Sequence, residues 1–219
     1  MKKLLLFLVL ASGIQVVSSQ DTVRLWTRYP GYVITLEGDT IKGALLLRNK
    51  ISNQSKVFFF KDMDADEPQA KYHAKDIRGY QVGPRTYCSL KFSGQNAMRN
   101  HNFLLVVVEG PLTLYKWYYD DTERLKIDDG DVWNAKIDLS FDEKGLSYQS
   151  VLTMPDGRLI DLSDMKYVLG FKKNMSKLLS DCTELADHIA RKDKGYTLDD
   201  MEAIAGEYNT WYLREHQKK

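Results

Sequence analysis

The sequence predicts an α+β protein, in which a mainly antiparallel β-sheet or a partly closed β-barrel is followed by a C-terminal helical segment. From Asp21 to about Asp161, apolar residues recur mostly with a period of two, and turn residues come at short intervals. After about Ser163 the apolar period becomes helical. The expected organisation is a signal peptide at 1–19, an antiparallel β-rich domain at 20–162 and a C-terminal helical segment packed on the sheet at 163–219.

The N-terminus, MKKLLLFLVLASGIQVVSSQ, has the pattern of a secretory signal peptide. Two lysines follow the first residue, Leu4 to Leu10 form the apolar region, and Val17 and Ser19 are the small residues before the expected cut. The apolar region is too short to span a bilayer, which needs about 20 residues. An uncleaved anchor is the alternative. We expect export to the periplasm or to the cell surface of a bacterium.

The charge of the chain is nearly balanced. Removal of residues 1–19 takes away two lysines and changes the formal net charge from +1 to −1. A chain with this balance has no electrostatic footprint for nucleic acid or for anionic lipid. We therefore expect no nucleic acid among its partners.

Two cysteines occur, Cys88 and Cys182. They can pair in an exported protein, and the favoured alternative is two buried thiols. Two cysteines are too few for a disulfide scaffold.

The first structural element expected is a hairpin in YVITLEGDTIKGALLL, residues 32–47. Glu37-Gly38-Asp39 supplies the turn, because glycine accepts a positive φ. The apolar residues that alternate along the two arms are Ile34, Leu36, Ile41, Leu45 and Leu47.

Six further segments have strand character. They are SKVFFF (55–60), DIRGYQV (76–82), RTYCSLKF (85–92), KIDLSF (136–141), YQSVLTM (148–154) and RLIDL (158–162). The last two are joined by Pro155-Asp156-Gly157, a turn sequence. The polar, acidic segments at 62–70 and 120–131 are expected to be exposed loops.

The most apolar stretch after the N-terminus is FLLVVVEGPLTLYKWYY, residues 103–119. Glu109-Gly110-Pro111 divides it into halves too short to cross a membrane, so it predicts a hairpin with a covered first strand. On the second strand Tyr115, Trp117 and Tyr119 share one face. These three aromatics are the predicted ligand-binding residues, for a small apolar ligand. A packed sheet face is the alternative.

Helical signals dominate the C-terminal segment. Asp181 with Glu184 resembles an acidic capping box at the start of a helix, and Gly195 is its expected stop. Thr197 with Asp200 is expected to cap the last helix. An earlier helix is expected at 171–179. The apolar face of each helix must pack on the sheet, on another helix or on a partner protein.

No catalytic residue, metal ligand or cofactor is predicted. The four histidines are scattered, and the sequence has no nucleophile elbow, P-loop or dinucleotide-binding glycine pattern. Cys182 at a helix start is expected to be a packed small residue rather than a nucleophile. Asp62, Asp64 and Asp66 alternate as calcium ligands can, but the spacing of a calcium-binding loop fails, so a solvated acidic loop is expected.

Several segments resemble a known group of proteins. GYVITLEGDTIKG, DIRGY, VVVEGPLTLY and the tail DCTELADHIARKDKGYTLDDMEAIAGEYN are similar to exported, functionally uncharacterised β-rich proteins of Bacteroidota-type bacteria. The resemblance covers most of the chain after the signal peptide. It implies a location in the bacterial envelope, and it transfers neither a catalytic residue nor a ligand.

Three functions remain open. The first is a non-enzymatic binding or interaction protein of the envelope, which follows from the export signal and from the lack of a catalytic motif. The second is a carrier of a small apolar ligand in a barrel or a sheet cleft, which the face of Tyr115 and Trp117 favours. The third is a hydrolase whose acid/base pair is assembled only in the folded chain. The oligomeric state is left open.

Overall fold

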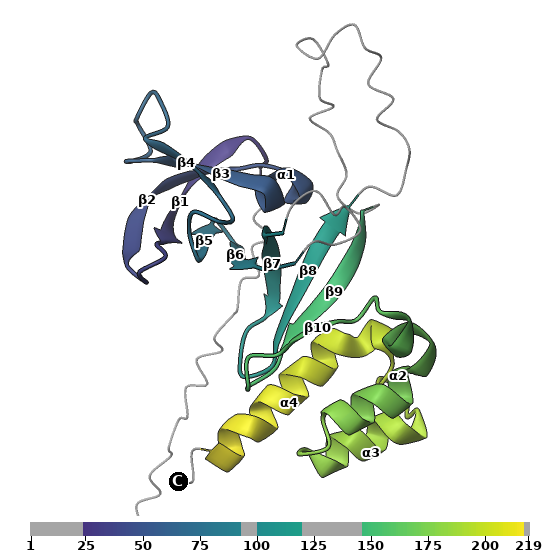
Figure 1. Ribbon diagram of the computed structural model, residues 1–219. Coiled ribbons are helices and arrows are strands. Elements are labelled where there is room, and N and C mark those ends of the chain that lie inside the picture. The colour runs from purple at the N-terminus through teal and green to yellow at the C-terminus, as the bar shows by residue number, and fades with distance from the viewer. Residues whose placement is uncertain (1–23, 93–99, 120–145, 217–219) are drawn as a thin grey trace, which may run out of the picture.

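The computed structural model describes residues 24–92, 100–119 and 146–216 (Figure 1). In this part of the chain ten strands form one antiparallel sheet. The strands are β1 (Thr27–Ile34), β2 (Thr40–Leu47), β3 (Lys56–Phe60), β4 (Ala70–His73), β5 (Gly79–Val82), β6 (Arg85–Leu90), β7 (Asn102–Val108), β8 (Thr113–Tyr119), β9 (Ser147–Thr153) and β10 (Leu159–Asp161). Their order across the sheet is β10-β9-β8-β7-β6-β5-β1-β2-β3-β4. The sheet is open, with β4 and β10 at its edges.

Most helices follow the last strand, so the predicted α+β class is confirmed. The helical elements are α1 (Lys50–Ser55), α2 (Met165–Leu178), α3 (Thr183–Arg191), the 3₁₀ turn η2 (Leu198–Asp200) and α4 (Met201–His216). α4 packs on β7 and β8, whereas α2 packs on α3, which in turn contacts α4. Figure 1 shows the strands β1 to β6 curled at one end of the molecule and the helices α2 to α4 gathered at the other. None of the helices described is long and apolar enough to cross a bilayer.

The predicted hairpin at residues 32–47 is confirmed. β1 and β2 pair from Ile34 opposite Thr40 to Thr27 opposite Leu47. Gly38 has a φ of 104° in the turn, a conformation that glycine adopts without strain.

The predicted hairpin at 103–119 is also confirmed. β7 lies between β6 and β8, as expected for a covered strand, and a bulge occurs between Val106 and Val108. Segments 55–60, 76–82, 85–92 and 158–162 contain β3, β5, β6 and β10, respectively, and segment 148–154 covers β9 except for its first residue, Ser147. The predicted strand at 136–141 and the predicted loop at 120–131 lie outside the described residues.

Three apolar clusters hold these elements together. The N-terminal core lies under β1 to β6, and the helix-side core lies between the sheet and α2 to α4. The aromatic cluster consists of Phe92, Leu104, Tyr115, Trp117 and Val151, and it lies on the opposite face of β8 from the helices. Side chains alternate along a strand, so Leu114 enters the helix-side core while its neighbour in sequence enters the aromatic cluster.

β7 contributes to all three clusters. Phe103 and Leu105 contact the N-terminal core, Leu104 and Val106 the aromatic cluster, and Val107 the helix-side core. This strand therefore joins the two ends of the molecule through packing on both of its faces.

Two amide side chains attach helices to the ends of β8. The side chain of Asn209 in α4 accepts a hydrogen bond from the backbone N–H of Leu112 at 2.7 Å and donates one to its carbonyl at 2.9 Å. At the other end, Gln54 of α1 accepts from the N–H of Tyr118 at 2.6 Å and donates to its carbonyl at 2.8 Å. Both amides satisfy buried backbone groups as a neighbouring strand would.

Several predictions about the helices were wrong. α3 begins at Thr183 after an N-cap, Cys182, that has no side-chain capping bond, so the expected box of Asp181 and Glu184 does not form. The carboxylate of Asp181 instead accepts a hydrogen bond from the hydroxyl of Tyr208 at 2.6 Å. α3 also ends before Gly195.

The end of α3 and the start of α2 differ from the predicted boundaries, whereas the predicted cap before α4 is confirmed. The left-handed residue that ends α3 is Lys192, with a φ of 60°, and Gly195 adopts its positive φ in the loop beyond. Thr197 and Asp200 do form the predicted capping box, in η2, which leads into α4. α2 begins at Met165, six residues before the helix expected at 171–179.

Candidate functional site

Two of the predicted ligand-binding residues, Tyr115 and Trp117, belong to the aromatic cluster, and the third, Tyr119, packs against it. Tyr115 and Trp117 are buried, and Tyr119 is half-buried beside them. The rings of Trp117 and Tyr119 stack with centroids 5.6 Å apart, and Phe92 meets Trp117 edge-on at 6.0 Å. The structure therefore brings the three residues together on one face, where they pack against one another. Ligand binding by this face stays a prediction.

The two cysteines are free thiols on different clusters. Cys88 is half-buried beside the aromatic cluster, and Cys182 is buried in the helix-side core. Burial raises the pKa of both thiols. Because the thiolate is the nucleophilic form, neither environment activates a cysteine for catalysis. The favoured alternative of unpaired thiols is confirmed, with Cys88 less buried than expected.

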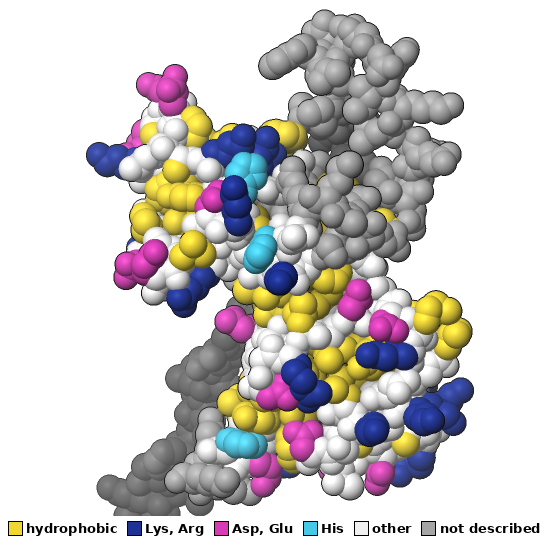
Figure 2. Space-filling view, in the orientation of Figure 1, with side chains coloured by type: hydrophobic (Ala, Val, Ile, Leu, Met, Phe, Trp, Pro, Cys, Tyr) yellow, Lys and Arg dark blue, Asp and Glu magenta, His cyan; other side chains and the backbone are white. Residues whose placement is uncertain are grey.

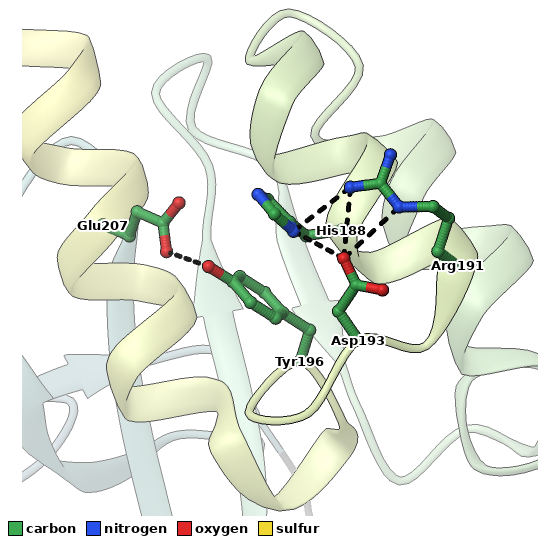
Figure 3. A network of polar contacts seen from close by, with 5 residues as sticks. All are labelled: His188, Arg191, Asp193, Tyr196 and Glu207. Carbon is green, nitrogen blue, oxygen red and sulfur yellow. Dashed lines mark hydrogen bonds and ion pairs between the residues drawn. The ribbon is translucent and has the colours of Figure 1, made fainter.

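A polar network joins the end of α3 to the following loop and to α4 (Figure 3). Nδ1 of His188 lies 2.6 Å from Oδ2 of Asp193, and the guanidinium of Arg191 donates to the same oxygen. The ring of His188 stacks on Tyr196 at 4.8 Å, and the hydroxyl of Tyr196 donates to Glu207 at 3.1 Å. The hydrogen bond from His188 and the contacts of Arg191 lower the pKa of Asp193.

This network contains a histidine–carboxylate pair of the kind a hydrolase uses, yet its geometry is that of a helix end. The backbone N–H of Asp193 donates to the carbonyl of His188, and Lys192 between them is left-handed, as at many helix C-termini. Cys182 lies at the opposite end of α3, six residues and about 9 Å of helix rise from His188. The network therefore fixes the loop to the helices and assembles no nucleophile.

The acidic loop at 62–70 is exposed along most of its length, as predicted. The guanidinium of Arg28 donates to the carbonyls of Met63 and Ala65, and Asp62 accepts from the backbone N–H of Asp64 at 3.1 Å. Within the described ranges no group of three or more His, Cys, Asp or Glu side chains is placed to hold a metal ion.

The surface of α2 carries the largest exposure of apolar side chains described. Met165 is 63% exposed, Val168 49% and Leu169 78%. On the same helix Tyr167 and Met175 are buried in the helix-side core. We call the three exposed residues the α2 apolar patch. Figure 2 shows hydrophobic side chains on the outer side of the helical end, near several Lys and Arg side chains.

A kink shapes this surface. Gly170 leaves helical geometry with φ −120° and ψ 30°, and the amide of Asn174 donates to the carbonyls of Lys166 and Gly170 at 2.6 and 3.0 Å. A Cβ at position 170 would stand 2.7 Å from Nδ2 of Asn174, so a side chain there would displace the amide that bonds across the kink. The first turns of α2 are thereby set at an angle to the second half.

Sequence reasoning missed the α2 apolar patch. The expected helix began at Phe171, so the residues before the kink were not assigned to it. Asp164 was the available signal, since it is the N-cap of α2 and its side chain accepts from the backbone N–H of Lys166. Comparison with protein families, curated proteins and solved structures finds no match to this chain.

Proposed function

We propose that the protein is a non-enzymatic interaction protein of the bacterial envelope and that the α2 apolar patch is its contact surface. The signal-peptide pattern and the resemblance to exported proteins support the location. His188 and Asp193 belong to the end of α3, and burial raises the pKa of both thiols, which supports a role in binding rather than catalysis.

The exposure of Leu169 is the observation that carries this proposal. A leucine that is 78% exposed beside two other exposed apolar residues leaves their hydrocarbon in water. On the same helix Tyr167 and Met175 are buried in the helix-side core, so the three exposed residues lie on the side of α2 that faces away from it. Contiguous exposed apolar residues often mark interaction sites.

A photoreactive amino acid at position 169 tests this proposal in the cells that make the protein. Irradiation should give covalent adducts at position 169. A matched control places the same group at Leu36, which is 49% exposed near the turn between β1 and β2. Equal adduct yields at both positions, or none at position 169, would refute the assignment of the contact surface.

A second candidate is carriage of a small apolar ligand at the aromatic cluster. It is supported by the concentration of aromatic surface at Tyr115, Trp117 and Tyr119, on the sheet face opposite the helices. Native mass spectrometry of the protein from its own cells should then show added mass that disappears on denaturation. Loss of that mass in Trp117→Leu, with retention in a Leu36→Ser control, would assign it to the cluster. A bare protein mass would count against carriage.

A further inference from the structure

The exposed side of α2 is basic as well as apolar. The stretch from 165 to 180 contains four lysines and no acidic residue. All four lysines are exposed, and they are Lys166, Lys172, Lys173 and Lys177. Lys172 and Lys173 follow the kink, close in sequence to Leu169. The balanced charge of the whole chain therefore conceals a local excess of positive charge.

The carboxylates at the two ends of α2 do little to neutralise these lysines. Asp164 caps the helix, and its carboxylate lies 3.9 Å from the ammonium of Lys166. Asp181 accepts hydrogen bonds from the hydroxyl of Tyr208 and from the backbone N–H of Cys182. Three of the four lysines, at positions 172, 173 and 177, have no carboxylate partner among the described residues.

Apolar and basic side chains on one exposed helix match one kind of partner. At an anionic lipid surface, apolar side chains enter the boundary between headgroups and acyl chains, while lysines approach the headgroup charges. Lysine also suits this position because its long stem packs along apolar surface while its ammonium stays at the polar level. We propose that α2 docks the protein on an anionic lipid surface, an inference that rests on the proposed function of the α2 apolar patch.

Two other occupants suit this surface less well. A second copy of the chain that docked through the same surface would place its own four lysines against these four, and like charges across an interface are unfavourable. A stable protein interface buries about 800 Å² on each partner around an apolar centre. The patch of three residues, bordered by lysines, is small for such a centre.

Vesicle co-sedimentation tests the proposal directly. The protein is purified from the envelope of the cells that make it. It is then mixed with vesicles of phosphatidylcholine alone or with vesicles that also contain about 30% phosphatidylglycerol, which gives a strongly negative surface. Binding is expected to the anionic vesicles and to be lost in about 0.5 M salt, where screening is strong. All variants carry the same N-terminus, so binding by residues 1–23 is common to them.

Matched variants separate the two contributions. Lys172→Gln combined with Lys173→Gln should weaken the partition constant about 25-fold, at roughly fivefold for each lysine. Leu169→Ser should weaken it about tenfold through lost apolar burial. Two controls should bind like the unaltered protein: Lys61→Gln with Lys71→Gln for charge, and Leu36→Ser for apolar exposure, all at exposed positions. Unchanged circular dichroism confirms folding.

The outcomes distinguish this inference from the proposed function. Binding to anionic vesicles that falls in the α2 variants, but not in the controls, supports lipid docking. Absence of binding, or binding that is equal in all variants, overturns lipid docking. If adducts at position 169 then contain a protein, the contact surface stands with a different partner. If position 169 gives no adduct in cells, the proposed function itself fails.

Discussion

The side-chain amide of Asn209 forms hydrogen bonds with both backbone polar groups of Leu112. One side-chain amide on α4 replaces a neighbouring strand at the point where the chain enters β8, with contacts of 2.7 and 2.9 Å. The contact is buried and spans 97 residues of sequence. It is therefore a tertiary contact between the sheet and the last helix, in addition to the apolar packing of α4 in the helix-side core.

Replacement of Asn209 should be costly because it leaves two buried backbone groups without partners. Asn209→Ala is expected to lower the free energy of unfolding by about 2–4 kcal/mol. Urea unfolding followed by circular dichroism measures the change. Thr210→Ala, at an exposed position of the same helix, should stay within about 0.5 kcal/mol. Equal effects of the two substitutions would show that the hydrogen bonds of Asn209 to Leu112 add no stability.

Glycine substitutions should have opposite effects at two positions near this contact. A Cβ at Gly110 would stand 2.3 Å from Nδ2 of Asn209, so Gly110→Ala should destabilise the protein by about 1–3 kcal/mol. Nothing lies within 4 Å of a Cβ at Gly206 in α4, so Gly206→Ala should stabilise it by about 0.5–1 kcal/mol. Thermal unfolding measures both. The penalty at Gly110 should shrink in an Asn209→Ala background, and full additivity would contradict the steric explanation.

Gln54 should protect one backbone amide from exchange. Its side chain accepts from the N–H of Tyr118 at 2.6 Å, so Gln54→Ala should speed hydrogen exchange at Tyr118 about tenfold. Nuclear magnetic resonance resolves individual amides for this measurement. The amide of Leu162, which donates to the carbonyl of Ser150, is the internal control for global opening. A uniform change at both amides would show that the bond has no local effect.

Asp193 should titrate below the ordinary range of an aspartate, about 3.9. The hydrogen bond from His188, together with Arg191, lowers its pKa in the folded protein. A depressed folded pKa contributes stability above the unfolded pKa, and that contribution is lost as pH falls through the folded value. Carbon-13 titration of the carboxyl group measures the pKa. Arg191→Gln should raise the midpoint, and an unchanged midpoint would contradict the role of the guanidinium.

Both cysteines should be found as thiols without reductant. Cys88 and Cys182 are unpaired and lie in separate clusters. Alkylation of the denatured protein should add two groups per chain by mass spectrometry. Alkylation of the folded protein near pH 8 should be slow, because burial raises both pKa values. A mass two hydrogens lower, with no alkylation, would reveal a disulfide.

The hairpins were predictable because their signals are local. The segment at 32–47 contains its own turn glycine, and the segment at 103–119 contains its own break. The capping box of Thr197 with Asp200 is local in the same way. Asp181 had the same kind of spacing, but a distant residue, Tyr208, takes up its carboxylate. Short-range patterns therefore predicted elements well until a tertiary partner competed for the same side chain.

The missed elements depend on contacts that a pattern does not contain. α1 has six residues and no apolar stripe, and it is held by buried amides: Asn53 bonds to Tyr80, and Gln54 to β8. β4 forms only where β3 pairs with it across the acidic loop. The α2 apolar patch is composed of the same residue types as a core stripe. Only the structure shows that Met165 and Leu169 face solvent.

The shared strand β7 has a consequence for synthesis. A chain is made from its N-terminus, and Phe103, which is fully buried in the N-terminal core, arrives only with β7. Until then β6 is an unpaired edge, and the core of the first six strands lacks one of its largest side chains. Until β7 is made, the nascent first half therefore has an open strand edge and an incomplete core, two features that favour aggregation.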